Sequence, residues 1–285
     1  NMKNPIRVTT LIENTVNKGG LLAEHGLSLY IEAGPRRILL DSGQTPNLLH
    51  NARKLNIPLQ TLDAIVLSHG HYDHTGGLHA VLEQAPNAHL YLHPDALKPR
   101  FNRDPDGSAR PIGMPADIAD AVHNRMDRVS WTTAPTQIFD RFFVTGPIPR
   151  ETSYEDAGGP MFVDAACQQP DPFRDDQALF FLGPQGTHVL LGCAHSGVVN
   201  TLRYIRQITH DNPIHTVMGG MHLCSASSAR LDQTVAALRE LNIQRLAPAH
   251  CTGWAATAAL WNAFPGKCSS CATGTRILFE TADNA

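Results

Sequence analysis

The sequence predicts an α/β fold in which two mixed β-sheets are covered by helices. Short apolar runs bounded by glycine and turn residues recur from residue 6 to residue 280, and from residue 47 onward they alternate with segments of helical spacing. Hydrophobic residues make up 42% of the chain and charged residues 17%, a balance that suits a folded core and excludes a disordered chain. Strands that first cluster and then alternate with helices indicate two sheets.

The N-terminal part predicts three strands before the first helix. Apolar, β-branched and aromatic residues dominate all three, and glycine or turn residues separate them. After them, apolar spacing of three and four residues predicts helices, and short apolar runs predict buried strands. The strands are expected over residues 6–14, 27–34, 36–43, 63–70 and 89–94, and the helices over 47–56 and 76–85.

Residues 94–175 interrupt this regularity with proline, glycine and charge, and predict only one helix, over 116–126. We interpret the segment as an elaboration that covers the mouth of an active site, within a single domain of residues 1–285. Residues 177–197 predict a hairpin because a PQGT turn joins two apolar runs. Further helices are expected over 198–208, 229–241 and 253–264, and further strands over 214–220, 244–251 and 275–280.

The overall charge and hydropathy exclude several classes of protein. A net charge of −3 gives no electrostatic footprint for nucleic acid. No apolar run approaches the roughly 20 residues that span a bilayer, and the start of the chain lacks the order of a signal peptide. We therefore expect a soluble, cytoplasmic protein that acts on a small molecule, with its six cysteines as thiols. The sequence does not predict its oligomeric state.

The stretch LSHGHYDHTGGL, residues 67–78, carries the clearest chemical signal. Burying His69, His71, Asp73 and His74 together is costly without a partner. Imidazole and carboxylate groups bind zinc and similar ions at roughly 2.0–2.2 Å, and such an ion compensates that cost. In a loop that leaves a strand, the first two histidines can face one metal position while the aspartate and third histidine face another. A solvated polar loop is the alternative, which four ligands at this spacing disfavour.

The remaining ligands of a two-metal site must come from elsewhere in the chain. His195, His222 and His250 each follow a predicted strand, where ligands gather in open α/β sheets. For His222, ligation, substrate contact and a structural role all stay open. Asp41 ends another strand and can orient a ligand histidine. Nine histidines receive no functional role: His25, His50, His79, His89, His93, His123, His188, His210 and His215.

The pattern His-x-His-x-Asp-His, preceded by LLDSG and followed by isolated downstream histidines, resembles the metallo-β-lactamase superfamily. More narrowly, the chain is similar to the branch of 7,8-dihydropterin-6-methyl-4-(β-D-ribofuranosyl)aminobenzene-5'-phosphate synthase. The resemblance extends from about residue 6 to residue 280. It is carried by the motifs GPIPRET, DDQAL, GCAHSGVVNT, GGMHL and PAHCTG.

The resemblance implies a four-layer αββα sandwich with a dinuclear metal site at one edge. It implies that the first metal is held by His69, His71 and His195, and the second by Asp73, His74 and His250. Cys193 stands where the wider superfamily commonly has aspartate or cysteine, so either Cys193 ligates or His195 serves alone. A thiolate favours zinc, the metal we expect, whereas nitrogen and oxygen ligands alone also accept iron or manganese.

Such a site predicts a hydrolase or transferase. Two metals about 3.5–4 Å apart activate a shared water and polarise the substrate, and Asp73 can orient that water or accept its proton. A small, phosphorylated or pterin-like substrate is expected to meet the cations Lys98, Arg100, Arg103 and Arg150. The free amides of the helix that starts at SGVVNT can hold an anion.

Other functions on the same fold stay open because fold does not fix function. A lactonase, a thioesterase and a phosphodiesterase use related chemistry, and a ligand-binding protein can retain the metal cage without turnover. The pair Cys268 and Cys271 has C-x2-C spacing, but no further ligands accompany it, so we interpret it as incidental.

Overall fold

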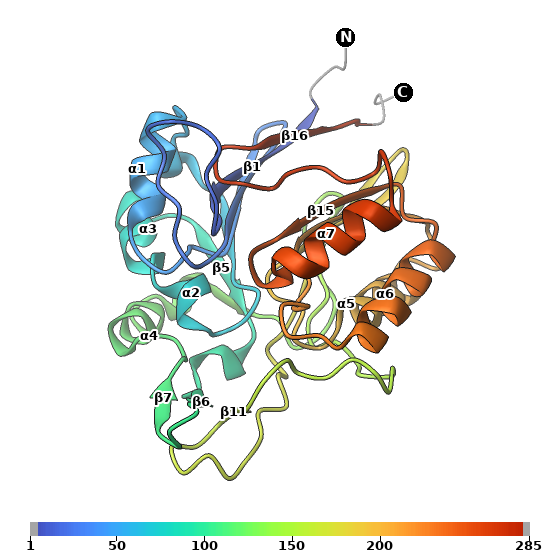
Figure 1. Cartoon of the computed structure of the whole chain (residues 1–285). Helices are drawn as coiled ribbons and strands as arrows, with labels where there is room; N and C mark the ends of the chain where they lie inside the picture. Colours follow the sequence, from blue (N-terminus) through green and yellow to red (C-terminus); the bar gives the residue numbers. More distant parts are fainter. Residues whose placement is uncertain (1–4, 282–285) are drawn as a thin grey trace.

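The computed structural model describes residues 5–281 and contains two large β-sheets between two layers of helices (Figure 1). The predicted α/β class and its αββα order are therefore confirmed. The outermost residues of the predicted domain, 1–4 and 282–285, lie outside the described part.

The first sheet has the strand order β16-β1-β2-β3-β4-β5-β8. The N-terminal meander pairs antiparallel, whereas β3, β4, β5 and β8 run parallel to one another. The strands are β1 (Ile6–Ile12), β2 (Ser28–Ala33), β3 (Arg36–Leu40), β4 (Ala64–Val66), β5 (His89–Leu92), β8 (Val129–Trp131) and β16 (Arg276–Phe279).

The second sheet has the order β15-β14-β13-β12-β10-β9, with β13, β14 and β15 parallel. Its strands are β9 (Thr136–Phe139), β10 (Phe142–Val144), β12 (Leu179–Gly183), β13 (Gly186–Leu191), β14 (Ile214–Gly220) and β15 (Arg245–Ala249). A small third sheet holds β11 (Met161–Phe162), β6 (Phe101–Arg103) and β7 (Ala109–Pro111).

The helices flank the two large sheets on their outer faces (Figure 1). On the first sheet these are α1 (Asn47–Lys54), α3 (Leu78–Gln84) and α4 (Ala116–His123). On the second they are α5 (Val198–Ile208), α6 (Ser228–Glu240) and α7 (Trp254–Ala263). The short helix α2 spans Tyr72–Thr75, and 3-10 turns span Leu59–Thr61, Pro94–Leu97, Met126–Arg128 and His250–Thr252.

The alternation of side chains along the strands builds three apolar layers. In β3, Leu39 packs under the helices, while Ile38 and Leu40 face the opposite sheet. In β12, Phe181 fills the space between the sheets and Phe180 packs against the outer helices. Both sheets are thus buried on both faces, which explains why their strands appear in the sequence as continuous apolar runs.

The predicted elements outside residues 94–175 are present, but that segment contains more regular structure than its sequence suggests. It supplies β8 to the first sheet and β9 and β10 to the second, besides the three strands of the small sheet. These strands are two to four residues long, too short for a period of two to stand out. None of the helices within residues 5–281 is long and apolar enough to cross a membrane.

Candidate metal centre

The predicted ligands come together at the edge of the sandwich where the parallel strands of both sheets end. The loop after β4 carries the motif of residues 69–74, and the segments after β13, β14 and β15 carry His195, His222 and His250. Parallel strands end on one side of a sheet, and the packing of the two sheets brings both sets of ends to one site. The sequence places these residues up to 181 positions apart (250 minus 69).

Three buried imidazole nitrogens face one another at the first predicted position. The Nε2 atoms of His69, His71 and His195 have no hydrogen-bond partner. Ligand atoms of these three residues lie within 4.8 Å of one another. A buried polar atom left unpaired costs about 1–3 kcal/mol. Three such atoms facing one point fit a bound cation, which would use all three lone pairs.

The second predicted position has a similar spacing. His250 Nε2 lies 3.2 Å from Asp73 Oδ2 and 3.3 Å from His74 Nε2, and the last two atoms are 3.8 Å apart. Ligand atoms that surround one ion tetrahedrally at 2.0–2.2 Å lie about 3.3–3.6 Å from one another. Asp73, His74 and His250 therefore have the donor chemistry and separations that one such ion needs.

Neighbouring acceptors orient four of the five proposed ligand histidines. His74 Nδ1–H donates to Asp41 Oδ2 at 2.7 Å, and His250 Nδ1–H donates to the Oδ1 atom of Asn14 at 2.8 Å. His69 Nδ1 lies 2.9 Å from Ser68 Oγ, and His195 Nδ1 lies 3.3 Å from the carbonyl of Ala157. With the proton on Nδ1, each ring presents the Nε2 lone pair to the centre, as metal-binding histidines require.

Asp41 lies where the sequence predicts a supporting carboxylate. It is fully buried and accepts hydrogen bonds from the backbone amide and hydroxyl of Ser68 as well as from His74. One carboxylate thus fixes both the start of the ligand loop and one of its histidines. Asp41 has a φ of 58°, and Ala194, His222 and His250 also have positive φ angles between 47° and 54°. Strained backbone of this kind persists where surrounding contacts hold it, commonly at functional sites.

Burial and charge shift the protonation of the cluster in two directions. Desolvation lowers the pKa of His69 and His195 well below the ordinary histidine value and lowers that of His71 to about 4, so these rings are neutral. Burial also opposes the charged form of His74, but the Asp41 and Asp73 carboxylates outweigh it and raise its pKa to about 9. A cation beside His74 Nε2 would take the place of that proton.

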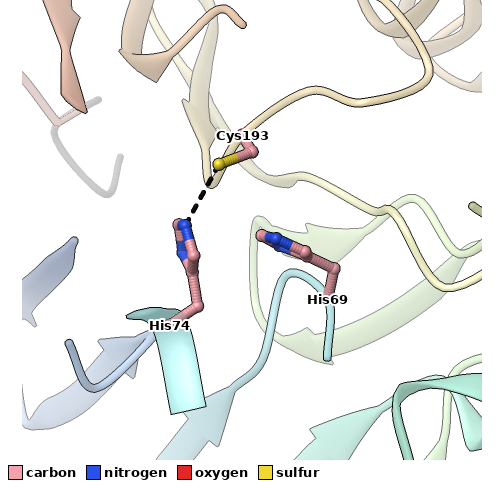
Figure 2. Close-up of side chains that lie close together, drawn as sticks. All are labelled: His69, His74 and Cys193. Carbon is pink, nitrogen blue, oxygen red and sulfur yellow. Dashed lines mark hydrogen bonds between the residues drawn. The ribbon is translucent and has the colours of Figure 1, made fainter. Parts of the chain in front are cut away.

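Cys193 and His222 border the same cluster. Figure 2 shows the Cys193 sulfur directed toward His74, with His69 beside them, and the sulfur lies 3.1 Å from His74 Nε2. Desolvation raises the pKa of the Cys193 thiol well above its usual value. The His222 ring centroid lies 4.3 Å from that of His195, and the buried His222 Nδ1 has no hydrogen-bond partner. Both residues are thus close enough to contact a metal or a substrate.

A cavity of about 700 Å³ opens in front of these residues. His71, Asp73, Cys193, His195, His222 and His250 line its inner end. Its outer wall includes Trp254 and Trp261, which lie on one face of α7. The other lining residues include Tyr72, Arg110 and Met161. Trp254 is 79% exposed, an unusual state for a large apolar side chain.

Two residues at the site were missed by sequence reasoning. His25 was assigned no role, yet its Nε2 lies 3.2 Å from Asp73 Oδ2. Trp254 received no role because helical spacing cannot distinguish an apolar residue in the core from one that faces a cavity. The strand-end position that pointed to His195 and His250 is absent for His25, which precedes β2.

The four cations predicted to contact substrate do not line the cavity. Arg100 is buried and bound to Asp171 and Asp175, so it holds the elaboration together. The other three are exposed and engaged elsewhere. Lys98 pairs with Asp95, Arg103 donates to a carbonyl and covers the Phe162 ring, and Arg150 donates to the carbonyls of His195 and Glu155. The structure does not support a substrate role for these residues, and it places Arg110 in the cavity wall in their place.

The predicted anion site at the start of α5 is also occupied from within the chain. The carboxylate of Glu155 accepts hydrogen bonds from the amides of Val199 and Asn200, each at 2.8 Å. An internal carboxylate therefore satisfies the helix terminus, and the expectation of an external anion there is corrected. Cys268 and Cys271 belong to none of the candidate metal-binding groups found within residues 5–281.

Comparisons with known proteins agree with this geometry. The sequence profile of the metallo-beta-lactamase superfamily matches residues 22–204. The chain belongs to the metallo-beta-lactamase superfamily. Among solved structures, this superfamily member is similar to Tm1679, a metal-dependent hydrolase of the beta-lactamase superfamily. The two share 28% sequence identity with a TM-score of 0.81, and the match covers 98% of this chain and 100% of that one.

Two relatives from Methanocaldococcus jannaschii match most of this superfamily member. One is 7,8-dihydropterin-6-methyl-4-(beta-D-ribofuranosyl)-aminobenzene-5'-phosphate synthase, 27% identical over 88% of this chain and 89% of that protein. The other is an uncharacterized protein, 32% identical over 87% of this chain and 91% of its own length. The predicted similarity to the synthase branch is therefore confirmed.

Proposed function

We propose that the protein is a metal-dependent hydrolase or transferase with a dinuclear centre. The observation that carries the proposal is the set of three buried, unpartnered Nε2 atoms on His69, His71 and His195, which belong to one cluster of candidate ligands. His71 and His195 also line the cavity. Packing in an apolar core does not explain why three buried imidazole nitrogens lie together without hydrogen-bond partners, because buried polar atoms normally have them. The membership of the superfamily and the similarity to a metal-dependent hydrolase support the same reading.

In this proposal His69, His71 and His195 hold one ion, and Asp73, His74 and His250 hold the other. Zinc is the expected metal, with iron or manganese as the alternatives. Bound there, a pair of metals supplies an activated water and a Lewis acid for the substrate. Asp41 keeps His74 in the tautomer that ligates. Asp73, at the cavity wall, orients the attacking group and takes up a proton.

The cavity supports a small molecule as substrate, because about 700 Å³ matches the usual size of sites for such ligands. A pterin-like or phosphorylated compound is the class we propose, on the basis of the phosphorylated dihydropterin after which the synthase relative is named. The net charge of −3 supports neither a nucleic-acid partner nor an anionic membrane surface. A cytoplasmic location remains part of this proposal.

Metal analysis combined with turnover measurements tests the proposal. Purified protein supplied with zinc, iron or manganese is expected to retain two ions per chain and to turn over at least one member of a panel of pterin, ester, lactone, thioester and phosphodiester substrates. Retention of metal without any turnover would favour a ligand-binding protein. Failure to retain any of the three metals would refute the dinuclear centre.

Two separate substitutions of aspartate by asparagine serve as the test variant and its control. Asp73→Asn is expected to abolish turnover and release one of the two ions, because the amide binds metal more weakly than the carboxylate. Asp232→Asn, on the exposed face of α6, should retain both ions and full turnover. Equal behaviour of the two variants would remove Asp73 from the site.

A further inference from the structure

A short segment between β11 and β12, residues 173–177, contacts both parts of the chain that supply the first metal position. We call this segment the clamp. Its buried side chains are Phe173, Asp175, Asp176 and Gln177. The clamp ends just before β12, which runs antiparallel to β13, so it lies beside the turn that carries His195. No member of the clamp belongs to a donor group found within residues 5–281, so any effect on a metal must pass through the ligands.

On the side of the first sheet, the clamp holds the backbone of the ligand loop. Asp175 Oδ2 accepts a hydrogen bond at 2.8 Å from the backbone amide of Gly70, the residue between the first two ligand histidines. Gln177 donates its side-chain amide to the carbonyl of Leu67 at 2.8 Å and its backbone amide to the carbonyl of Ser68 at 2.9 Å. These three hydrogen bonds fix the backbone that carries the first two ligand histidines.

On the side of the second sheet, the clamp holds His195 in two ways. Asp176 Oδ2 accepts a hydrogen bond at 2.8 Å from the backbone amide of Ser196, the next residue in the chain. The Phe173 ring stacks on the His195 imidazole, with 4.3 Å between the ring centroids and 11° between the planes. Phe173 has a φ of 51°, a conformation that persists in an aromatic residue only where surrounding contacts hold it. Both the backbone and the ring of His195 are thus fixed.

A buried ion pair links the clamp to the elaboration. Arg100 is 3% exposed, donates to Asp175 Oδ1 at 3.1 Å and also pairs with Asp171. The two carboxylate oxygens of Asp175 therefore serve different partners, one the guanidinium and the other the ligand loop. Because an unpaired buried guanidinium is strongly unfavourable, Arg100 keeps the Asp175 carboxylate in place.

The contacts of the clamp favour one metal position over the other. Within residues 5–281, the hydrogen bonds and ring contacts of its side chains do not reach Asp73, His74 or His250. The two histidines of the second position donate instead to Asp41 and Asn14. A disturbed clamp should therefore affect the first ion and spare the second.

We propose that the clamp positions the ligands of the first metal position and thereby sets the metal affinity of that position but not of the second. The proposal rests on the dinuclear centre proposed above. Phe173, Asp175, Asp176 and Gln177 are positioning residues in this account, because they act on the metal through the ligand loop and through His195. Ligands that surrounding contacts already hold in place bind more tightly, since less freedom is lost on binding.

Zinc affinity in variants that keep one metal position tests the proposal. His250→Ala removes a ligand of the second position and retains the first, and His195→Ala does the reverse. In His250→Ala, the further change Asp176→Ala should weaken zinc binding by about 10–100-fold, the usual cost of lost support for a ligand. In His195→Ala, the same change should leave zinc affinity unchanged. Competition with a chromogenic chelator measures both affinities without any substrate.

Two further variants separate positioning from a general loss of stability. Asp176→Asn should recover most of the affinity, because its amide oxygen can still accept the Ser196 N–H. Thr145→Val is the matched control, since the buried Thr145 hydroxyl oxygen accepts a hydrogen bond at 3.0 Å from the amide of Ala178, the residue that follows the clamp. This variant loses a contact of the same kind, so it should lower stability but leave zinc affinity at both positions unchanged.

Phe173→Leu gives a second measurement if Asp176→Ala does not fold. In His250→Ala it should weaken zinc binding by about 2–10-fold, the contribution of one stacked ring contact. Unchanged affinity at the first position in either folded variant would overturn the proposal. Equal losses at both positions would overturn it too, because they indicate a general structural role. Both results leave the dinuclear centre intact, whereas a wild-type protein that binds no zinc, iron or manganese would refute the centre and, with it, the role of the clamp.

Discussion

The two sheets contribute to the candidate site in contrasting ways. The first sheet supplies four donors from one loop of six residues, His69 to His74, whereas the second supplies His195 and His250 from two strand ends 55 positions apart (250 minus 195). The four donors of the loop lie on one continuous segment, which Asp41 and Asp175 hold from other parts of the chain. The donors of the second sheet depend on the parallel register of β13, β14 and β15. The donors of the first sheet therefore form a sequence motif, whereas the donors of the second sheet are brought together by the topology of the strands.

The largest effect is expected from removing a predicted ligand of the first metal position, either from the loop of the first sheet or from the second sheet. His71→Ala and His195→Ala should lower turnover equally, by about 10³-fold or more, because a metal supplies several kcal/mol of transition-state stabilisation. Steady-state kinetics and metal content measure this. His215→Ala, which changes a half-buried histidine outside the cavity, should match the wild type. A much smaller loss in His195→Ala than in His71→Ala would show that the loop alone builds the centre.

A smaller effect is expected when the support of the loop is removed. Asp41→Asn keeps the size of the side chain but removes the charge that holds the Ser68 and His74 contacts. Metal affinity should fall by about 10–100-fold, the usual cost of losing a partner of a metal-binding histidine. Metal competition against a chelator measures this. Asp63→Asn, which disturbs the partly exposed pair with Arg36, is the control and should leave the affinity unchanged.

His188 extends the comparison of the two sheets to a histidine without a role in the site. It is a buried residue of the second sheet, and it does not line the cavity. Desolvation lowers its pKa to about 4, so its neutral form stabilises the fold above the unfolded pKa of 6.5, and this stability is lost as the pH falls from 6.5 toward 4. The loss at pH 5 is about 2 kcal/mol. In His188→Gln the stability should fall less between pH 7.5 and pH 5 in urea unfolding. An identical pH dependence would contradict this.

The smallest effect is expected at the outer wall of the cavity. Trp254 lines the cavity from α7, and its indole carries no group that binds a metal. Trp254→Ala should raise KM by about 2–10-fold and leave kcat nearly unchanged, because aromatic contacts contribute about 0.5–1.5 kcal/mol. Trp131→Ala, at a partly exposed position of β8 that does not line the cavity, is the control. A drop in kcat without a change in KM would place Trp254 closer to the chemistry.

Most of the fold could be predicted from the sequence because the long strands and helices carry their own periodicity. The runs that became β1 and β13 and the spacing that became α5 and α6 are local patterns. The short strands β8, β9 and β10 were missed because their pairing with distant strands, and not their own residues, makes them strands. The expected substrate cations failed for a similar reason, since nothing in the sequence shows that Arg100 pairs with Asp171 and Asp175.

The sequence by itself determined the chemistry of the candidate centre. The residue types of the loop from His69 to His74, and the histidines at strand ends, already predict a metal site, with zinc expected and iron or manganese as the alternatives. The tertiary structure decided which of these groups meet, that Cys193 lies among them while Arg150 faces elsewhere, and that Trp254 borders the cavity. The physical reason is that ligand type is a property of single side chains, whereas distances of 3–4 Å between remote residues exist only after the two sheets have packed.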